Sequence, residues 1–185
     1  MIDFEKLSQA ELVKFARLLD EQVSAYDEGK LELYEPHPGQ KLFHEKPHKI
    51  RLLISGNRYG KSECSVMEAI WLCLGNHPYH PRKVPVKGIL YVESFGKASQ
   101  VIEPKLEHWL HSKYLTSKKP YMRDNHQNLV QVNFANGSTL RIGTYDQTLK
   151  KAESSDWDFV GFDEPPSRDL YVANLRGTVD RGGLL

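Results

Sequence analysis

The sequence has few cysteines, no long apolar run and almost no net charge, and each of these limits what the chain can be. Its two cysteines, Cys64 and Cys73, fall in one predicted helix, where their separation and direction do not suit a mutual disulfide. We therefore expect reduced thiols and an intracellular setting. No stretch approaches the roughly eighteen apolar residues of a membrane helix, and residues 1–5 are acidic where a secretory signal is basic. These absences predict a cytosolic protein with no membrane contact.

The formal net charge of +1 gives the chain no global basic field. Contact with nucleic acid would then require a local patch or the assembly of several copies. The 185 residues are 39% hydrophobic and 26% charged, which is typical of a soluble protein with a substantial core. We expect an N-terminal helical segment over residues 1–32 and one larger domain over residues 33–185.

The N-terminal segment has apolar residues at mostly helical spacing over residues 7–26. Ser8 and Glu11 form a capping-box pattern near its start, and the helix is predicted to end near Gly29. An amphipathic helix that packs against the domain is the favoured interpretation, and a partner-binding helix is the alternative.

The stretch around which the domain is organised covers residues 50–74. It reads as an apolar run at 50–55, predicted to be a strand, then a glycine-containing turn that ends in G-K-S, then a helical pattern that stops at Gly75. A turn of this kind binds phosphate, because glycine allows close approach, backbone N–H groups point inward, and the lysine supplies a cation. A surface turn that contains G-K-S by chance is the alternative, but the flanking strand and helix favour a nucleotide site. The general pattern G-x-x-x-x-G-K-[ST] has glycine where Ser55 stands, whereas here Gly56 follows it.

Residues 158–164, D-F-V-G-F-D-E, are the second chemical signal, an apolar strand that ends in two carboxylates. At the end of a strand the chain turns, so both side chains can face one site. Asp163 would hold magnesium through its water shell, and Glu164 would orient or deprotonate an attacking water. The alternative is an acidic turn after a core strand, but a phosphate loop upstream favours the catalytic interpretation.

Three further patterns complete the predicted sheet. Residues 88–92 predict a second buried parallel strand, and residues 102–110 predict a helix with Pro104 in its first turn. Residues 129–145 alternate around Asn136-Gly137, which predicts a hairpin inserted into, or added at the edge of, a mainly parallel sheet.

Two polar stretches carry weaker signals. Gln40 lies in a proline-punctuated segment upstream of the loop, where its amide could read an adenine edge while Tyr34 or Phe43 covers the base; a solvated glutamine is the alternative. Residues 112–128 are the most basic stretch, either a solvated loop or a contact to a nucleic-acid backbone.

His77 and His80 have no further metal ligands at suitable spacing, so no metal is expected there.

Together these motifs resemble the large subunit of the tailed-phage DNA-packaging terminase. Residues 55–62, S-G-N-R-Y-G-K-S, are similar to the arginine-containing Walker A loop of that family, and residues 160–165, V-G-F-D-E-P, to its Walker B strand. Residues 36–40, P-H-P-G-Q, look like its adenine-reading glutamine motif. The resemblance covers the chain from about Tyr34 onward and implies an α/β P-loop NTPase of the ASCE or RecA-like type, with a mainly parallel sheet flanked by helices and a β-hairpin addition.

The resemblance implies a role for each motif residue. Glu164, Lys61 and Arg58 would be catalytic, with Arg58 sensing or stabilising the γ-phosphate. Ser62 and Asp163 would hold Mg²⁺. The residues that would bind ATP are Gln40, Gly56, Asn57, Arg58, Tyr59, Gly60, Lys61 and Ser62.

The same resemblance implies ATP hydrolysis with magnesium that drives double-stranded DNA into a procapsid. The partners would be the DNA, further copies in a ring on the portal, the portal protein and the small terminase subunit, with the protein in the host cytoplasm and transiently at the portal. The nuclease domain of that family is not encoded in these residues. Three alternatives are a helicase-like or other nucleic-acid-dependent ATPase, a small-molecule kinase, and a nucleotide-binding assembly module without turnover of its own. The adjacent Asp163 and Glu164 argue against a kinase, because such a carboxylate activates water.

Overall fold

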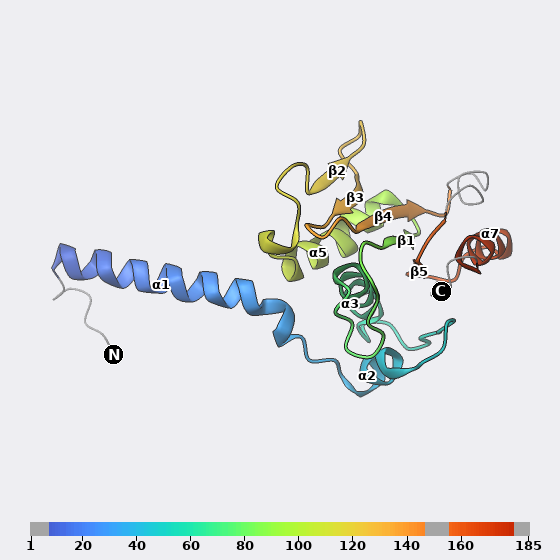
Figure 1. Cartoon of the computed structure of the whole chain (residues 1–185), viewed down its shortest axis with the longest axis horizontal. Helices are drawn as coiled ribbons and strands as arrows, with labels where there is room; N and C mark the ends of the chain where they lie inside the picture. The colour runs from blue at the N-terminus through green and yellow to red at the C-terminus, as the bar shows by residue number, and fades with distance from the viewer. Residues whose placement is uncertain (1–7, 147–155, 180–185) are drawn as a thin grey trace. The chain divides into compact units, whose positions relative to one another are not determined.

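The computed structural model describes residues 8–146 and 156–179 (Figure 1), and the chain divides into two compact units, Met1–Glu35 and Pro36–Leu185. The smaller unit contains helix α1 (Gln9–Gly29) and the 3₁₀ turn η2 (Lys30–Leu33). The predicted capping box is present, because the Ser8 side chain accepts from the Glu11 N–H while the Glu11 carboxylate accepts from the Ser8 N–H. No residue of α1 is buried. None of the described helices is long and apolar enough to cross a membrane.

The larger unit is built on a five-stranded sheet with the order β2-β3-β4-β1-β5. Strand β1 (Lys87–Val92), the middle one of three parallel strands, pairs with β4 (Thr139–Thr144) on one side and with β5 (Phe159–Phe162) on the other. Antiparallel pairing then adds β3 (Leu129–Asn133) and β2 (Tyr121–Arg123) beyond β4. The predicted hairpin is therefore β3–β4, and it extends the edge of the sheet while its inner strand belongs to the parallel part.

Helices flank both faces of this sheet. Alternate residues of β1 point to opposite faces, so Ile89 and Tyr91 pack with Val160 of β5 and with Leu170 of α7 (Arg168–Val179). Leu90 faces the other side, where α3 (Lys61–Leu74) contacts β1, β4 and β5. The parallel core therefore lies between α3 and α7, which confirms the predicted α/β architecture.

The helix α3 is apolar on almost every side and carries both cysteines. Cys64 and all residues from Val66 to Cys73 are buried, and Gly75 ends the helix in the left-handed conformation at φ 77°, as predicted. Both thiols are free and buried. Burial raises the pKa of Cys64 to about 12, and the nearby charge of Glu68 adds to this shift.

Shorter elements connect these parts. The helix α2 (Pro38–Glu45) lies upstream of the phosphate loop. Between β1 and β2 the chain forms α4 (Phe95–Lys97), the π-helical turn η3 (Ala98–Ile102), α5 (Glu103–Trp109) and the 3₁₀ turn η4 (Ser112–Tyr114). Pro104 lies in the first turn of α5, as its sequence position predicts.

The prediction of a strand at residues 50–55 is wrong. This segment is extended but pairs with no strand among the described residues. It keeps the alternation of a strand, because Leu52 and Ile54 are 76% and 83% exposed while Leu53 is half-buried. A strand needs a hydrogen-bonded neighbour, and the sheet ends at β5 with a cavity between that edge and residues 50–55.

Candidate nucleotide site

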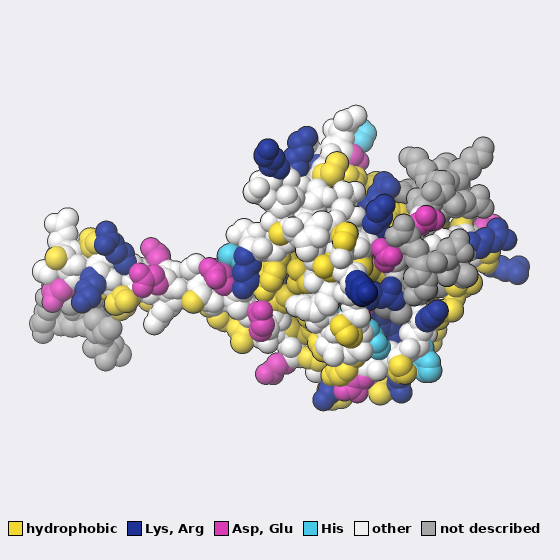
Figure 2. Space-filling model, viewed as in Figure 1, with side chains coloured by type: hydrophobic (Ala, Val, Ile, Leu, Met, Phe, Trp, Pro, Cys, Tyr) yellow, Lys and Arg dark blue, Asp and Glu magenta, His cyan; other side chains and the backbone are white. Residues whose placement is uncertain are grey.

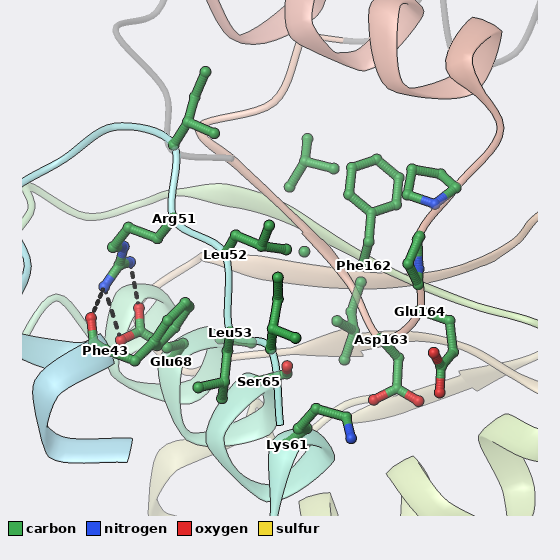
Figure 3. A pocket seen from close by; sticks show the side chains of 18 of the residues that line it. Phe43, Arg51, Leu52, Leu53, Lys61, Ser65, Glu68, Phe162, Asp163 and Glu164 are labelled. Carbon is green, nitrogen blue, oxygen red and sulfur yellow. Dashed lines mark hydrogen bonds and ion pairs between the residues drawn. The ribbon is translucent and has the colours of Figure 1, made fainter. Parts of the chain in front are cut away.

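A cavity of about 500 Å³ lies between residues 50–55, α3 and β5 (Figure 3). Most of its wall is apolar, with Leu52, Leu53, Ala69 and Phe162 among the lining residues. Figure 3 shows that Lys61, Ser65, Asp163 and Glu164 gather at one end. Ser55 and Asn57 of the loop also line the cavity. One cation, two carboxylates and the phosphate loop therefore meet at one polar end of the cavity, while Arg51 and Glu68 line it elsewhere.

The loop holds its lysine in place through its own carbonyl groups. Lys61 is the first residue of α3, and its Nζ donates to the carbonyls of Ser55 and Gly56, both at 3.0 Å. Gly60 caps the helix with φ 75°, and Arg58 has φ 62°, so two loop residues are left-handed. This conformation is costly for arginine, and it turns the chain sharply before the helix begins. The first N–H groups of α3 have no partner within the helix and suit an anion.

The carboxylates follow directly on β5. The Asp163 N–H donates to the Tyr91 carbonyl at 2.9 Å, which continues the β1–β5 pairing by one residue. The Asp163 Oδ1 atom is buried and has no hydrogen-bond partner among the described residues. Glu164 is exposed, and Tyr145 contacts its backbone from the end of β4. An unpartnered buried carboxylate oxygen is costly, so this atom is suited to a ligand that the chain itself does not supply.

Gln40 is tied to the phosphate loop. Its Nε2 donates to the Gly60 carbonyl at 3.0 Å, and its Oε1 accepts from the His37 N–H at 3.1 Å. His37 reaches the same loop, because its Nε2 lies 2.9 Å from the Tyr59 carbonyl and its Nδ1 accepts from the Gly39 N–H. These partners require the neutral ring with its proton on Nε2. The two residues therefore fasten α2 to the loop, while adenine reading by Gln40 stays a prediction.

A second polar group, unexpected from the sequence, is centred on Glu68 of α3, and its Arg51 and Glu68 also line the cavity (Figure 3). Glu68 is 6% exposed, and its Oε1 lies 2.6 Å from His44 Nδ1 and 3.1 Å from His77 Nε2. Arg51 donates to both carboxylate oxygens, at 3.0 and 2.6 Å. Burial alone would raise the pKa of Glu68, but the hydrogen bonds from His44, His77 and Arg51 hold it well below its usual range.

This Glu68 cluster has the donor set of a metal site, since the ligand atoms of His44, Glu68 and His77 lie within 4.8 Å of one another. The guanidinium of Arg51 already occupies both carboxylate oxygens and places a positive charge there, which opposes a cation. The His77 Nδ1 atom accepts from the N–H groups of Tyr79 and His80. The cluster is therefore a structural ion pair that ties residue 51, just before the loop, to the helix just after it.

The structure brings some of the predicted site residues together at the cavity and leaves others around it. Lys61, Asn57, Asp163 and Glu164 line it. Gly56, Arg58, Tyr59, Gly60, Ser62 and Gln40 are on or beside the loop but are not among the lining residues.

Sequence reasoning missed two residues. Glu68 stands in an otherwise apolar helix turn, and a charge in such a place must be paired, so its position was a usable signal. The sequence offered no such signal for Tyr145, because its partner is the backbone of a residue 19 positions away.

The parallel sheet, the left-handed turn leading into α3 and the carboxylates after β5 together define a P-loop NTPase fold. Two solved structures share it over 84% of this chain: the large terminase ATPase domain of Thermus phage P74-26, at 19% sequence identity and a TM-score of 0.57, and an arginine-to-alanine mutant of that domain, at 21% and 0.58. The matches cover 65% of each of those chains. No protein-family model and no curated protein matches the sequence. The fold is thus that of a large-terminase ATPase domain, as the motifs predicted.

Proposed function

We propose that this chain is the ATPase domain of a DNA-packaging terminase large subunit, which hydrolyses ATP with magnesium. The observation that carries the proposal is the meeting of Lys61, Asp163 and Glu164 at the polar end of one cavity. The similarity in fold to the phage terminase ATPase domain supports the same function. At the identity observed, fold alone leaves the activity to be tested.

The loop and the start of α3 would bind the phosphates. The unpaired N–H groups of the first helical turn point outward along the axis, and the helix dipole favours negative charge there. Lys61 would exchange its bonds to the Ser55 and Gly56 carbonyls for bonds to phosphate oxygens. Arg58, exposed on the loop, would add positive charge near the transferred group.

The residues present fit a magnesium ion. The unpartnered, buried Asp163 Oδ1 is an oxygen ligand of the kind that magnesium takes, and the Ser62 hydroxyl stands one residue after Lys61 in the first turn of α3. Held there, magnesium would supply positive charge that offsets the charge of the phosphates. Glu164, exposed beside Asp163, would accept a proton from the attacking water and orient it.

Duplex DNA would be the substrate moved, by a ring of copies on the portal that also contacts the portal protein and the small subunit. Lys118 and Lys119 are exposed, whereas Arg123 pairs with Glu103. Figure 2 shows Lys and Arg scattered among acidic and apolar side chains on the face that it presents, without one basic stripe across its described residues. Strong DNA contact would therefore depend on several copies acting together.

The direct test is ATP hydrolysis by the protein and by Glu164→Gln, with and without duplex DNA. We expect the variant to lose roughly 10²- to 10⁴-fold in kcat while it still binds ATP, because only the proton acceptor is removed. Lys61→Ala should instead lose nucleotide binding. Equal hydrolysis by the wild type and Glu164→Gln would contradict the assignment of Glu164.

Two other results would point to the alternatives. Unwinding of a forked duplex would favour a helicase-like ATPase. The chain alone could also fail to hydrolyse ATP and become active only when neighbouring copies or further parts of the polypeptide are added. This result would favour an assembly module whose active site those additions complete.

A further inference from the structure

Both polar groups of the Glu164 backbone are bound by one side chain. The Tyr145 hydroxyl accepts a hydrogen bond from the Glu164 N–H at 3.0 Å and donates one to the Glu164 carbonyl. Tyr145 directly follows β4, and its N–H donates to the Val92 carbonyl at 3.3 Å, at the end of β1. The side chain therefore reaches from the end of β4 past the end of β1 to the second residue after β5.

Few other backbone contacts hold Glu164 among the described residues. The last paired residue of β5 is Phe162, opposite Tyr91, and the Asp163 N–H makes the final bond to β1. The next two residues, Pro165 and Pro166, have no N–H to donate. Within the described part of the chain, the sheet thus fixes Asp163 by its backbone, while Glu164 is fixed by the tyrosine.

Tyr145 is itself well anchored and stays protonated. Its ring is half-buried and packs against the cluster that includes Tyr91, Val160 and Leu170. Burial raises the pKa of Tyr145 to about 12, and the charges of Asp163 and Glu164 act in the same direction. The hydroxyl therefore keeps the proton that it donates to the Glu164 carbonyl at neutral pH.

We infer that Tyr145 is the positioning residue of Glu164: through its hydroxyl it fixes the backbone from which that carboxylate is aimed at the attacking water. The inference rests on the proposed ATPase function. A displacement of about 1 Å in a catalytic group costs up to roughly a hundredfold in rate, so an anchor of this kind acts on turnover much more than on nucleotide affinity.

The test is Tyr145→Phe, which removes the hydroxyl and keeps the ring. We expect kcat for ATP hydrolysis to fall roughly ten- to a hundredfold, with the Kd for a fluorescent ATP analogue within about twofold of the wild type. Tyr121→Phe is the matched control, because it removes a hydroxyl from another half-buried tyrosine on β2, at the opposite edge of the sheet. The control should leave kcat unchanged.

A double-mutant cycle separates positioning from a merely structural role. If Tyr145 acts through Glu164, adding Tyr145→Phe to Glu164→Gln leaves the residual rate unchanged. A structural role would instead lower kcat in both backgrounds and weaken nucleotide binding together with thermal stability. Either of those results, or an unchanged kcat in Tyr145→Phe, would overturn the inference.

The two proposals fail in different ways. If the wild type neither binds nor hydrolyses ATP, the proposed function is wrong. If Glu164→Gln hydrolyses ATP as fast as the wild type, the assignment of Glu164 is wrong, and the role of Tyr145 falls with it. If Glu164→Gln is inactive while Tyr145→Phe is fully active, only the role of Tyr145 is wrong. Where turnover is too slow to give kcat, the affinity for ADP with aluminium fluoride can be measured instead, because that complex mimics the transferring phosphoryl group. Weaker binding of this complex by Tyr145→Phe, with unchanged binding of the ATP analogue, supports the inference. Equal affinity of the variant and the wild type for this complex contradicts it.

Discussion

The guanidinium of Arg51 donates to both carboxylate oxygens of Glu68, at 3.0 and 2.6 Å, across the phosphate loop that separates them in the sequence. Arg51 precedes the loop, and Glu68 lies on the helix that follows it. The pair therefore holds the two ends of the loop at a fixed distance, even though residues 50–55 have no strand partner in the described part of the chain.

We predict that Glu68→Gln destabilises the protein by about 3–5 kcal/mol, because it leaves the buried Arg51 charge without its partner. Urea unfolding followed by circular dichroism measures this. Glu63→Gln is the control on the same helix, since Glu63 pairs with Lys105 at the partly exposed surface and its loss should cost about 1 kcal/mol. Similar costs for the two variants would show that the Glu68 cluster is not a buried ion pair in solution.

The depressed pKa of Glu68 also predicts how stability depends on pH. The ordinary value is 4.5 and the folded value is lower, so the stabilisation from this group is complete above about pH 4.5 and is lost as the pH falls further. The free energy of unfolding should therefore drop more steeply below that pH in the wild type than in Glu68→Gln. Parallel curves for the two proteins would contradict the assignment.

Two glycines of the loop should respond differently to alanine. Gly60 has φ 75°, and an added Cβ would lie 2.7 Å from Gln40 Nε2, so Gly60→Ala strains the turn and displaces Gln40. A left-handed alanine costs about 1–2 kcal/mol. If the loop relaxes to avoid this strain, nucleotide affinity should fall roughly tenfold. A Cβ at Gly56 meets nothing within 4 Å, so Gly56→Ala should bind nucleotide normally. Titration of a fluorescent nucleotide compares them, and equal losses would be inconsistent with this loop conformation.

The exposure of residues 50–55 can be tested by replacing their apolar side chains with alanine. Leu52→Ala and Ile54→Ala remove side chains that are 76% and 83% exposed, so each should change the free energy of unfolding by about 0.5 kcal/mol or less. Leu53→Ala removes a half-buried side chain and should cost about 1–2 kcal/mol. A comparable cost at Leu52 would mean that this segment is covered in solution, as a paired strand would be.

The motifs that sequence reasoning could locate are those with short-range signatures. Asn136-Gly137 marked the β3–β4 turn, Gly75 marked the end of α3, and Ser8 with Glu11 marked the start of α1, because each depends on local backbone chemistry. Lys61, Asp163 and Glu164 were likewise predicted to share one site, since Lys61 begins the helix after the loop and the two carboxylates follow a strand of the same domain.

What could not be predicted depends on neighbours that are distant in the sequence. The apolar run 50–55 has strand composition, but a strand forms only beside a partner, and none is present among the described residues. The engagement of Gln40 with the Gly60 carbonyl likewise follows from how α2 packs beside the loop. The adjacent carboxylates suggested a catalytic pair, but the sequence did not indicate that the tyrosine directly after β4 would hold one of them.

The two buried thiols of α3 can report on ligand binding at the proposed nucleotide site. Cys64 and Cys73 are 1% and 0% exposed, and α3 begins at Lys61. A thiol reagent can therefore react only when this helix opens, so the labelling rate reports the free energy of that local opening. A nucleotide bound at Lys61 should slow labelling by the factor 1 + [L]/Kd, which makes the native cysteines reporters of ligand binding without any introduced probe.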